Sequence, residues 1–191
     1  AVAYATESLV HHTIILILAF STNMAAYLGD FSRGVSQHSN VFCLLQHPIQ
    51  EVSGKKLGII GFGELGRAVA EACKGLGLDV IVSERPGEAN RPGRREFNDV
   101  IAHADYLSLH CPLSDDIYHM IGPTVLSKMK PSAFLINTAR GGLVDSSALL
   151  AALKSGEIAG AAVDVLDIDP PKNVSDWEVQ TNIINVKNQI K

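Results

Sequence analysis

Three glycines between an apolar run and a helical pattern constrain the fold of this chain more than any other feature. Gly61, Gly63 and Gly66 follow the apolar run 57–60 at the spacing G-x-G-x-x-G. A strand that ends in a glycine turn and enters a helix gathers backbone N–H groups and the positive end of the helix dipole at one point. That point suits a pyrophosphate, because Gly61 permits the tight turn, Gly63 lets phosphates approach and Gly66 lets the helix pack closely. The same spacing also occurs in ordinary turns, so the neighbouring residues decide its meaning.

An acid follows at the distance that a dinucleotide site needs. Residues 80–83 are predicted to form a second buried strand, and Glu84 stands at its carboxyl end. A carboxylate there accepts the ribose hydroxyls of NAD and repels the 2′-phosphate of NADP, so the sequence favours NAD over NADP. Arg85 follows at once, and its guanidinium offers the opposite alternative of pairing with that phosphate. The remaining alternative is that Glu84 is a solvated loop acid.

Composition predicts one globular domain and limits the partners. The chain has 191 residues, of which 47% are hydrophobic and 19% charged, with a formal net charge of −4. This apolar content is enough for one core. The negative balance and the lack of a Lys/Arg run argue against a nucleic acid or an anionic membrane as the main partner. Cys43, Cys73 and Cys111 are widely spaced without a C-x-x-C motif, which is typical of reduced thiols and a cytoplasmic protein.

The most apolar stretch, 13–28, is too short and too interrupted for a membrane span, and no charged segment typical of a signal peptide precedes it. The pattern predicts one long helix from Thr6 to about Leu28, which needs an apolar partner. His11 and His12 lie in this helix without accompanying ligands, so no metal site is predicted. The polar segment 34–54 is expected to extend over a neighbouring surface, anchored by scattered apolar residues at Phe42, Leu44, Leu45 and Ile49.

The rest of the chain alternates strands and helices. Further strands are expected at 105–110, 133–137 and 160–164, with a possible sixth at 182–186. Helices are expected at 97–104, 124–129 and 145–154, and Asp145 is the predicted N-cap of the last one. This alternation predicts an α/β fold with a Rossmann-type, doubly wound parallel sheet.

Ligands of such a sheet collect beyond the carboxyl ends of its strands. Arg140 lies there, directly after a predicted buried strand and before Gly141 and Gly142. Its planar guanidinium suits a substrate carboxylate and an adjacent carbonyl oxygen, where hydride transfer would develop negative charge. The alternative on spacing alone is a loop arginine in a surface ion pair.

Several stretches together resemble the cofactor domain of the D-isomer-specific 2-hydroxyacid dehydrogenases. They are TESLVHHT (6–13), LGIIGFGELGRAVA (57–70), LSLHCPLSDD (107–116), LSKMKPSAFLINTARGGLVD (126–145) and GAAVDVLDIDPP (160–171). FCLLQHPI (42–49) and SERPG (83–87) are similar to the branch of the glycerate dehydrogenases, also called hydroxypyruvate reductases. The resemblance implies that residues 1–191 form an NAD-binding domain in which 5–50 supply a crossover helix and a dimerisation segment.

The resemblance also implies roles for single residues. Glu64, Leu65 and Gly66 would meet the pyrophosphate and Glu84 the adenosine ribose, while Asp164 would hold the carboxamide and Arg140 the 2-oxo acid substrate. The positions implied for the nicotinamide half are Cys111, Pro112, Thr138 and Ala139. The expected assembly is a homodimer.

The chain departs from the family pattern at its acid–base pair. Asp169 stands where the family has the Glu that holds a catalytic His, and it is one methylene shorter. The family's T-P-H motif would fall at 186–188, where this chain has Val, Lys and Asn, so the general acid is absent. The resemblance further implies that most of the substrate domain is missing. The alternative is a truncated or diverged module that binds a dinucleotide and dimerises without catalysis.

Overall fold

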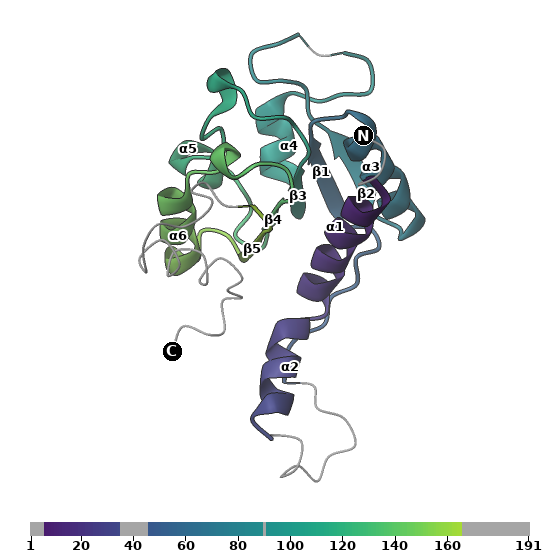
Figure 1. Cartoon of the computed structure of the whole chain (residues 1–191), viewed down its shortest axis with the longest axis vertical. Coiled ribbons are helices and arrows are strands. Elements are labelled where there is room, and N and C mark those ends of the chain that lie inside the picture. The colour runs from purple at the N-terminus through teal and green to yellow at the C-terminus, as the bar shows by residue number, and fades with distance from the viewer. Residues whose placement is uncertain (1–5, 35–45, 90, 166–191) are drawn as a thin grey trace.

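Five parallel strands form the centre of the structure, a computed structural model that describes residues 6–34, 46–89 and 91–165 (Figure 1). The strands lie in the order β2-β1-β3-β4-β5. Gly58 of β1 lies opposite Ile81 of β2 and Leu107 of β3. The predicted parallel sheet is therefore confirmed for five strands, whose bounds are β1 Lys56–Ile60, β2 Asp79–Val82, β3 Tyr106–Leu109, β4 Phe134–Asn137 and β5 Gly160–Val163. The possible sixth strand at 182–186 lies outside the described residues.

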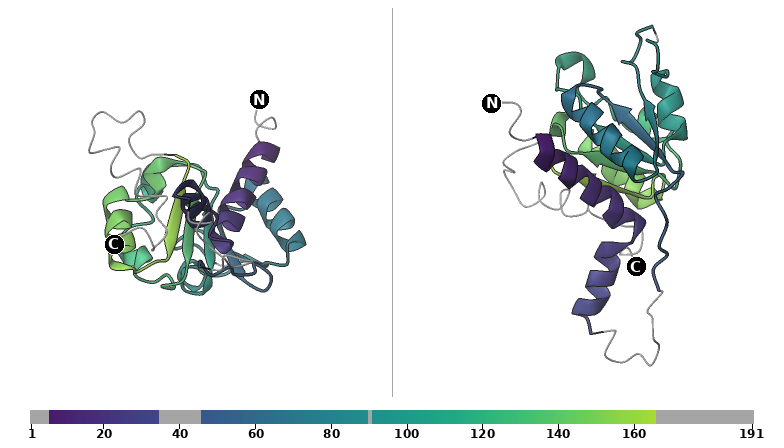
Figure 2. Two further views of the ribbon diagram at one scale, coloured as in Figure 1. Left: turned by 90° about the horizontal axis from the view of Figure 1, so that it is seen from below. Right: turned by 90° about the vertical axis from the view of Figure 1, so that its right-hand side faces the viewer.

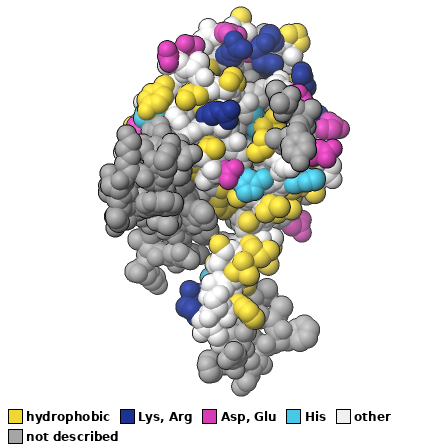
Figure 3. Space-filling view, in the orientation of Figure 1, with side chains coloured by type: hydrophobic (Ala, Val, Ile, Leu, Met, Phe, Trp, Pro, Cys, Tyr) yellow, Lys and Arg dark blue, Asp and Glu magenta, His cyan; other side chains and the backbone are white. Residues whose placement is uncertain are grey.

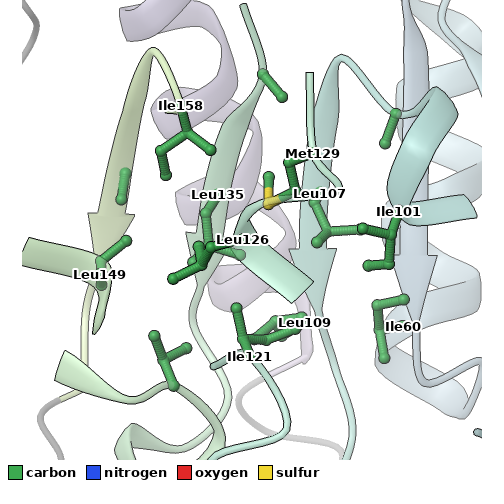
Figure 4. Packing of buried hydrophobic residues seen from close by; sticks show 14 of the residues in the cluster. Ile60, Ile101, Leu107, Leu109, Ile121, Leu126, Met129, Leu135, Leu149 and Ile158 are labelled. Carbon is green, nitrogen blue, oxygen red and sulfur yellow. The ribbon is translucent and has the colours of Figure 1, made fainter. Parts of the chain in front are cut away.

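Helices cover both faces of the sheet, as a doubly wound fold requires (Figures 1 and 2). One face carries α1 (Thr6–Ser21) and α3 (Glu64–Gly75), and the other carries α4 (Phe97–His103), α5 (Pro123–Leu126) and α6 (Ser146–Ser155). The strands alternate between the two cores: Tyr106 packs in the first, whereas Leu107 and Leu109 pack in the second (Figure 4). Asp145 caps α6 as predicted, because its Oδ1 accepts a hydrogen bond of 3.0 Å from the Ala148 N–H.

The prediction of one helix from Thr6 to Leu28 is wrong, because two helices occupy this region. The helix α1 ends at Ser21, and α2 (Met24–Ser32) continues after a bend of 70°. Thr22 Oγ1 donates to the Leu18 carbonyl at 2.7 Å, and Asn23 adopts a left-handed backbone with φ 51°. Short polar side chains compete with helical backbone bonds in this way. The helix α2 extends away from the sheet (Figure 1).

Among the described residues, no single helix has the length and apolar character to cross a membrane. The bent pair of α1 and α2 meets those two criteria only when its helices are counted together.

The turn between β1 and α3 is closely packed at two glycines. Gly61 has φ +93°, and a Cβ on it would lie 2.6 Å from the backbone nitrogen of Cys111. A Cβ on Gly66 would lie 2.1 Å from the Gly61 carbonyl oxygen. Neither backbone neighbour can yield as a flexible side chain would. The first turn of α3 is therefore held directly against the ends of β1 and β3.

His110 is a buried polar residue just beyond β3. Its Nε2 lies 2.9 Å from Ser108 Oγ, and its Nδ1 has no hydrogen-bond partner within the described residues. Burial lowers the pKa of the imidazole to about 4. His110 is therefore neutral in the folded protein at neutral pH.

We expect Gly66→Ala to lower the free energy of unfolding by about 2 kcal/mol or more, because its Cβ overlaps a backbone oxygen. Gly63→Ala is the matched control, since no atom lies within 4 Å of its added Cβ. Its cost should stay below about 1 kcal/mol. Urea denaturation followed by circular dichroism measures both, and equal losses would contradict the packing of this turn.

We also expect His110 to make stability depend on pH. The unfolded chain takes up the imidazole proton near the ordinary pKa of 6.5, whereas the folded chain resists it down to about 4. Stability should therefore fall as the pH drops, by up to about 2 kcal/mol from this residue between about pH 7 and pH 5. Urea denaturation at both pH values should show that His110→Gln loses less free energy of unfolding between pH 7 and pH 5 than the wild type does. An equal pH dependence of the two proteins would exclude this role for His110.

Candidate functional site

The carboxyl ends of the five strands meet at one edge of the sheet, because all of them run in parallel (Figure 1). This edge carries the predicted positions: residues 61–66 after β1, Glu84 after β2, Cys111 and Pro112 after β3, Thr138, Ala139 and Arg140 after β4, and Asp164 after β5. The structure thus gathers positions that are scattered along the sequence. Their roles in binding stay predictions.

The first half of α1 contributes to the same edge. Thr6 Oγ1 donates to Glu64 Oε1 at 3.3 Å, which links the start of α1 to the start of α3. Thr13 Oγ1 lies 3.3 Å from Thr138 Oγ1 in a buried contact. The apolar helix that the sequence left without a partner therefore packs on this sheet and borders the candidate site.

The start of α3 offers an approach for an anion. Glu64, Leu65 and Gly66 form the first turn of this helix, and the first amides of a helix have no carbonyl partner within it. Gly63 is exposed just before them, with no atom within 4 Å of the position that a Cβ would take. Backbone N–H groups at an open helix N-terminus suit phosphate oxygens. This part of the edge fits the pyrophosphate of a dinucleotide.

Glu84 is buried at the end of β2, with 1% of its side chain exposed. Arg91 Nε donates to its Oε2 at 2.7 Å, Arg91 Nη2 donates to Oε1, and Arg94 Nη1 donates to Oε1 at 3.2 Å. The hydrogen bonds from Arg91 hold the pKa of this carboxyl far below its ordinary value, although desolvation acts in the opposite direction. Glu84 is therefore ionised and paired, which excludes a solvated loop acid.

Arg85, the other residue predicted near the ribose, contacts Glu84 through its backbone and Glu88 through its side chain. Its backbone N–H donates to Glu84 Oε1 at 2.9 Å. Its guanidinium is exposed, with Nη1 3.5 Å from Glu88 Oε1. The sequence analysis did not identify Arg91 and Arg94, the two arginines whose side chains contact Glu84. The available signal was the group of arginines at positions 91, 94 and 95, soon after the second strand.

Arg140 precedes a short 3₁₀ turn, Gly141–Leu143, and its side chain is exposed. Its Nη1 donates to the Ala139 carbonyl at 2.6 Å. It forms no ion pair with any described residue, so the alternative of a surface ion pair has no support in that part of the chain. Only Nη1 of this guanidinium donates a hydrogen bond to a described residue, so its other N–H groups can bind a carboxylate at the sheet edge.

Asn137 positions this loop, and the sequence analysis missed it. The residue is fully buried at the end of β4. Its Nδ2 donates to the Arg140 carbonyl at 2.8 Å, and its Oδ1 accepts from the Ala139 N–H at 3.1 Å. The available signal was an amide side chain at the end of an otherwise apolar strand.

The positions predicted for the nicotinamide combine buried and exposed groups. Thr138 and Ala139 are buried, whereas Pro112 is exposed. Cys111 is partly buried, and burial raises the pKa of its thiol. These surroundings fit an aromatic amide ring better than a reactive thiolate site, because a nucleophilic cysteine needs a lowered pKa.

His12 is a second residue that the sequence analysis did not assign to the site. Its Nε2 lies 3.3 Å from Asp164 Oδ1, and both side chains are partly exposed. The sequence analysis placed His12 in the first helix and predicted no metal site there. No local signal could reveal the contact, because His12 and Asp164 lie far apart in the sequence.

Two predicted features of the acid–base pair cannot be placed. Asp169 and residues 186–188 lie outside the described residues, as do the anchors Phe42, Leu44 and Leu45.

Comparisons with known proteins agree with this geometry. The sequence profile described as "D-isomer specific 2-hydroxyacid dehydrogenase, NAD binding domain" matches residues 14–186. A glycerate dehydrogenase of Methylorubrum extorquens is 40% identical over 170 residues, which are 89% of this chain and 53% of that protein. A glyoxylate reductase of Thermococcus litoralis is 45% identical over 127 residues, which are 64% of this chain and 38% of that protein.

A solved structure supports the same assignment. The NAD-complexed D-isomer specific 2-hydroxyacid dehydrogenase of Lactobacillus delbrueckii ssp. bulgaricus superposes with a TM-score of 0.78 at 30% identity, over 96% of this chain and 58% of that one. The chain spans about half the length of the curated relatives it matches. It belongs to the D-isomer-specific 2-hydroxyacid dehydrogenase family and comprises the family's NAD-binding domain.

Proposed function

We propose that these residues form the cofactor half of an NAD-dependent oxidoreductase that interconverts a small 2-oxo acid and its 2-hydroxy acid. Hydroxypyruvate and glyoxylate are the substrates that we favour, because the named relatives are a glycerate dehydrogenase and a glyoxylate reductase. The observation that carries the proposal is the open helix N-terminus at Gly63, on the same sheet edge as Arg140, which forms no ion pair with any described residue.

Each part of the edge has a distinct task in this proposal. Residues 61–66 bind the pyrophosphate through backbone N–H groups, and Glu84 lies at the adenosine ribose. Thr138, Ala139, Cys111 and Pro112 surround the nicotinamide, which supplies the hydride when the cofactor is bound. Asp164 accepts from the carboxamide, and His12 orients Asp164 through their contact.

Arg140 binds the substrate carboxylate and polarises the adjacent oxo group. Its charge stabilises the negative charge that develops on that oxygen during reduction. Asn137 holds the backbone around Arg140 in position for this task. The proposed reaction also needs a proton for the substrate oxygen, and its donor would be a histidine paired with a carboxylate. The sequence has no histidine at 186–188, where the family resemblance places it. Asp169 stands at the position of the carboxylate that would pair with this histidine.

A non-catalytic module that binds the dinucleotide and dimerises is the second candidate. It shares the phosphate-binding turn and differs in having no use for Arg140. The histidine missing from 186–188 is the observation that favours it.

We also propose that the protein is cytoplasmic and acts as a homodimer. Support for the location comes from Cys73 and Cys111, which are free thiols. Support for the dimer comes from the arm formed by α2 and residues 46–50. Large apolar side chains are exposed along this arm and the adjacent part of α1 (Figure 3): Ile15, Met24, Leu28, Phe31 and Ile49.

The arm is internally organised, which suits a docking element. Tyr27 Oη donates to the His47 carbonyl at 2.7 Å, and His47 Nε2 lies 2.7 Å from Asp30 Oδ2. Phe31, near the end of α2, has 73% of its surface exposed. A second copy of the chain would bury these side chains.

For activity, we expect the 191-residue chain to turn over hydroxypyruvate at a negligible rate. Losing a positioned acid costs about 10²–10⁴ in rate, and residues 1–191 on their own do not supply the substrate positioning and water exclusion that a substrate domain provides. Absorbance of NADH measures the rate, and a full-length relative is the positive control. If the chain consumed NADH at a rate close to that of the relative, the prediction that it lacks the general acid would be wrong.

For assembly, we expect sedimentation velocity at micromolar concentration to show a dimer. The double variant Leu28→Glu, Phe31→Glu should sediment as a folded monomer, because two carboxylates would be buried in the interface. Leu76→Glu is the control, since this leucine is also exposed but lies at the end of α3, outside the arm. A monomeric wild-type chain would overturn the proposed dimer.

A further inference from the structure

The acid at the end of β2 has no free lone pairs for a ligand. Oε1 of Glu84 accepts from the Arg85 N–H, Arg91 Nη2 and Arg94 Nη1. Oε2 accepts from the N–H and the Nε of Arg91. A carboxylate has about four acceptor positions. Five donors therefore saturate this one, and a pair of ribose hydroxyls must displace Arg91 before Glu84 can accept from them.

The pairing also changes the sign of the charge at this place. Two guanidinium groups contact one carboxylate, so the cluster of Glu84, Arg91 and Arg94 carries a net positive charge. Only the carboxylate is buried, whereas half of the Arg91 side chain is exposed. An anion that approaches from solvent meets guanidinium N–H groups before it meets Glu84.

Arg94 links this cluster to the phosphate-binding turn. Its guanidinium carbon lies 5.9 Å from the centre of the Phe62 ring, in the turn between Gly61 and Gly63. Arg94 therefore lies between the end of β2 and the turn after β1. In a Rossmann-type domain the adenosine half of the cofactor binds between these two ends.

We propose that Arg91 and Arg94 determine cofactor specificity by making the ribose end of this site accept a 2′-phosphate, so that the chain binds NADPH as well as NADH. The inference rests on the proposed dinucleotide site. Arg91 uses only its Nε and Nη2 on Glu84, so it keeps N–H groups for phosphate oxygens. Arg85 is not needed for this, because its side chain faces Glu88.

Calorimetric titration of the wild-type chain with NADH and, separately, with NADPH tests the proposal. We expect a Kd for NADPH within about tenfold of that for NADH, whereas an unpaired carboxylate would discriminate by a much larger factor. Raising the salt concentration should weaken the binding of NADPH more than the binding of NADH, because the additional contact to the 2′-phosphate is ionic.

Two variants separate the arginines from the general charge of the loop. The double variant Arg91→Gln, Arg94→Gln should bind NADPH at least about tenfold more weakly, while NADH binding is unchanged or tighter because Glu84 is released. Arg95→Gln is the matched control: it removes one charge from the same loop, but Arg95 pairs with Asp99 at 3.4 Å. Its ratio of the two Kd values should equal that of the wild type. If the double variant does not fold, Arg94→Gln alone should shift the ratio in the same direction.

The outcomes are distinct. Saturable NADH binding with NADPH more than about 100-fold weaker would overturn this inference and leave the proposed function intact. An equal effect of Arg95→Gln and the double variant would overturn the assignment to Arg91 and Arg94. Binding of neither dinucleotide by the folded wild-type chain would instead overturn the proposed function.

Discussion

The contact between the glycine turn and its backbone neighbours determines the geometry of the whole candidate site. Side chains at Gly61 and Gly66 would overlap the Cys111 nitrogen and the Gly61 carbonyl oxygen. Because both positions lack a side chain, the N-terminus of α3 lies directly at the ends of β1 and β3. The backbone amides proposed to bind phosphate and the residues proposed to lie at the nicotinamide are thereby brought to one edge, and every function proposed for this chain depends on that proximity.

At the end of β2, the ion pairs of Glu84 determine the local structure. Glu84 is buried as an ion, which is tolerable only because guanidinium groups and backbone N–H groups satisfy its oxygens. The same pairing ties the loop after β2 to the sheet, where the Glu84 N–H donates to the Arg95 carbonyl at 2.8 Å. Glu84, which the sequence analysis identified by its distance from the glycine turn, thus also stabilises this loop. The carboxylate that the sequence predicted as a ligand contact therefore orders this loop.

Features with local signals could be predicted from the sequence, and long-range contacts could not. The glycine spacing and the apolar strand runs predicted the sheet and its strand ends, and the capping carboxylate of Asp145 predicted the start of α6. The break between α1 and α2 was missed because the apolar pattern continues through it, while the polar side chains of 21–23 interrupt only the backbone hydrogen bonds. The partners of Glu84 and Asp164 depend on how the loop after β2 and α1 fold back, which no local pattern encodes.

The central claim is that this chain has a working dinucleotide site at the turn after β1, and calorimetric titration with NADH tests it most directly. We predict saturable binding by the wild-type chain and its loss in folded Gly63→Ala, whose added methyl group would occupy the space through which the pyrophosphate approaches the backbone. Absence of binding to the wild-type chain, or undiminished binding to the variant, would contradict the account.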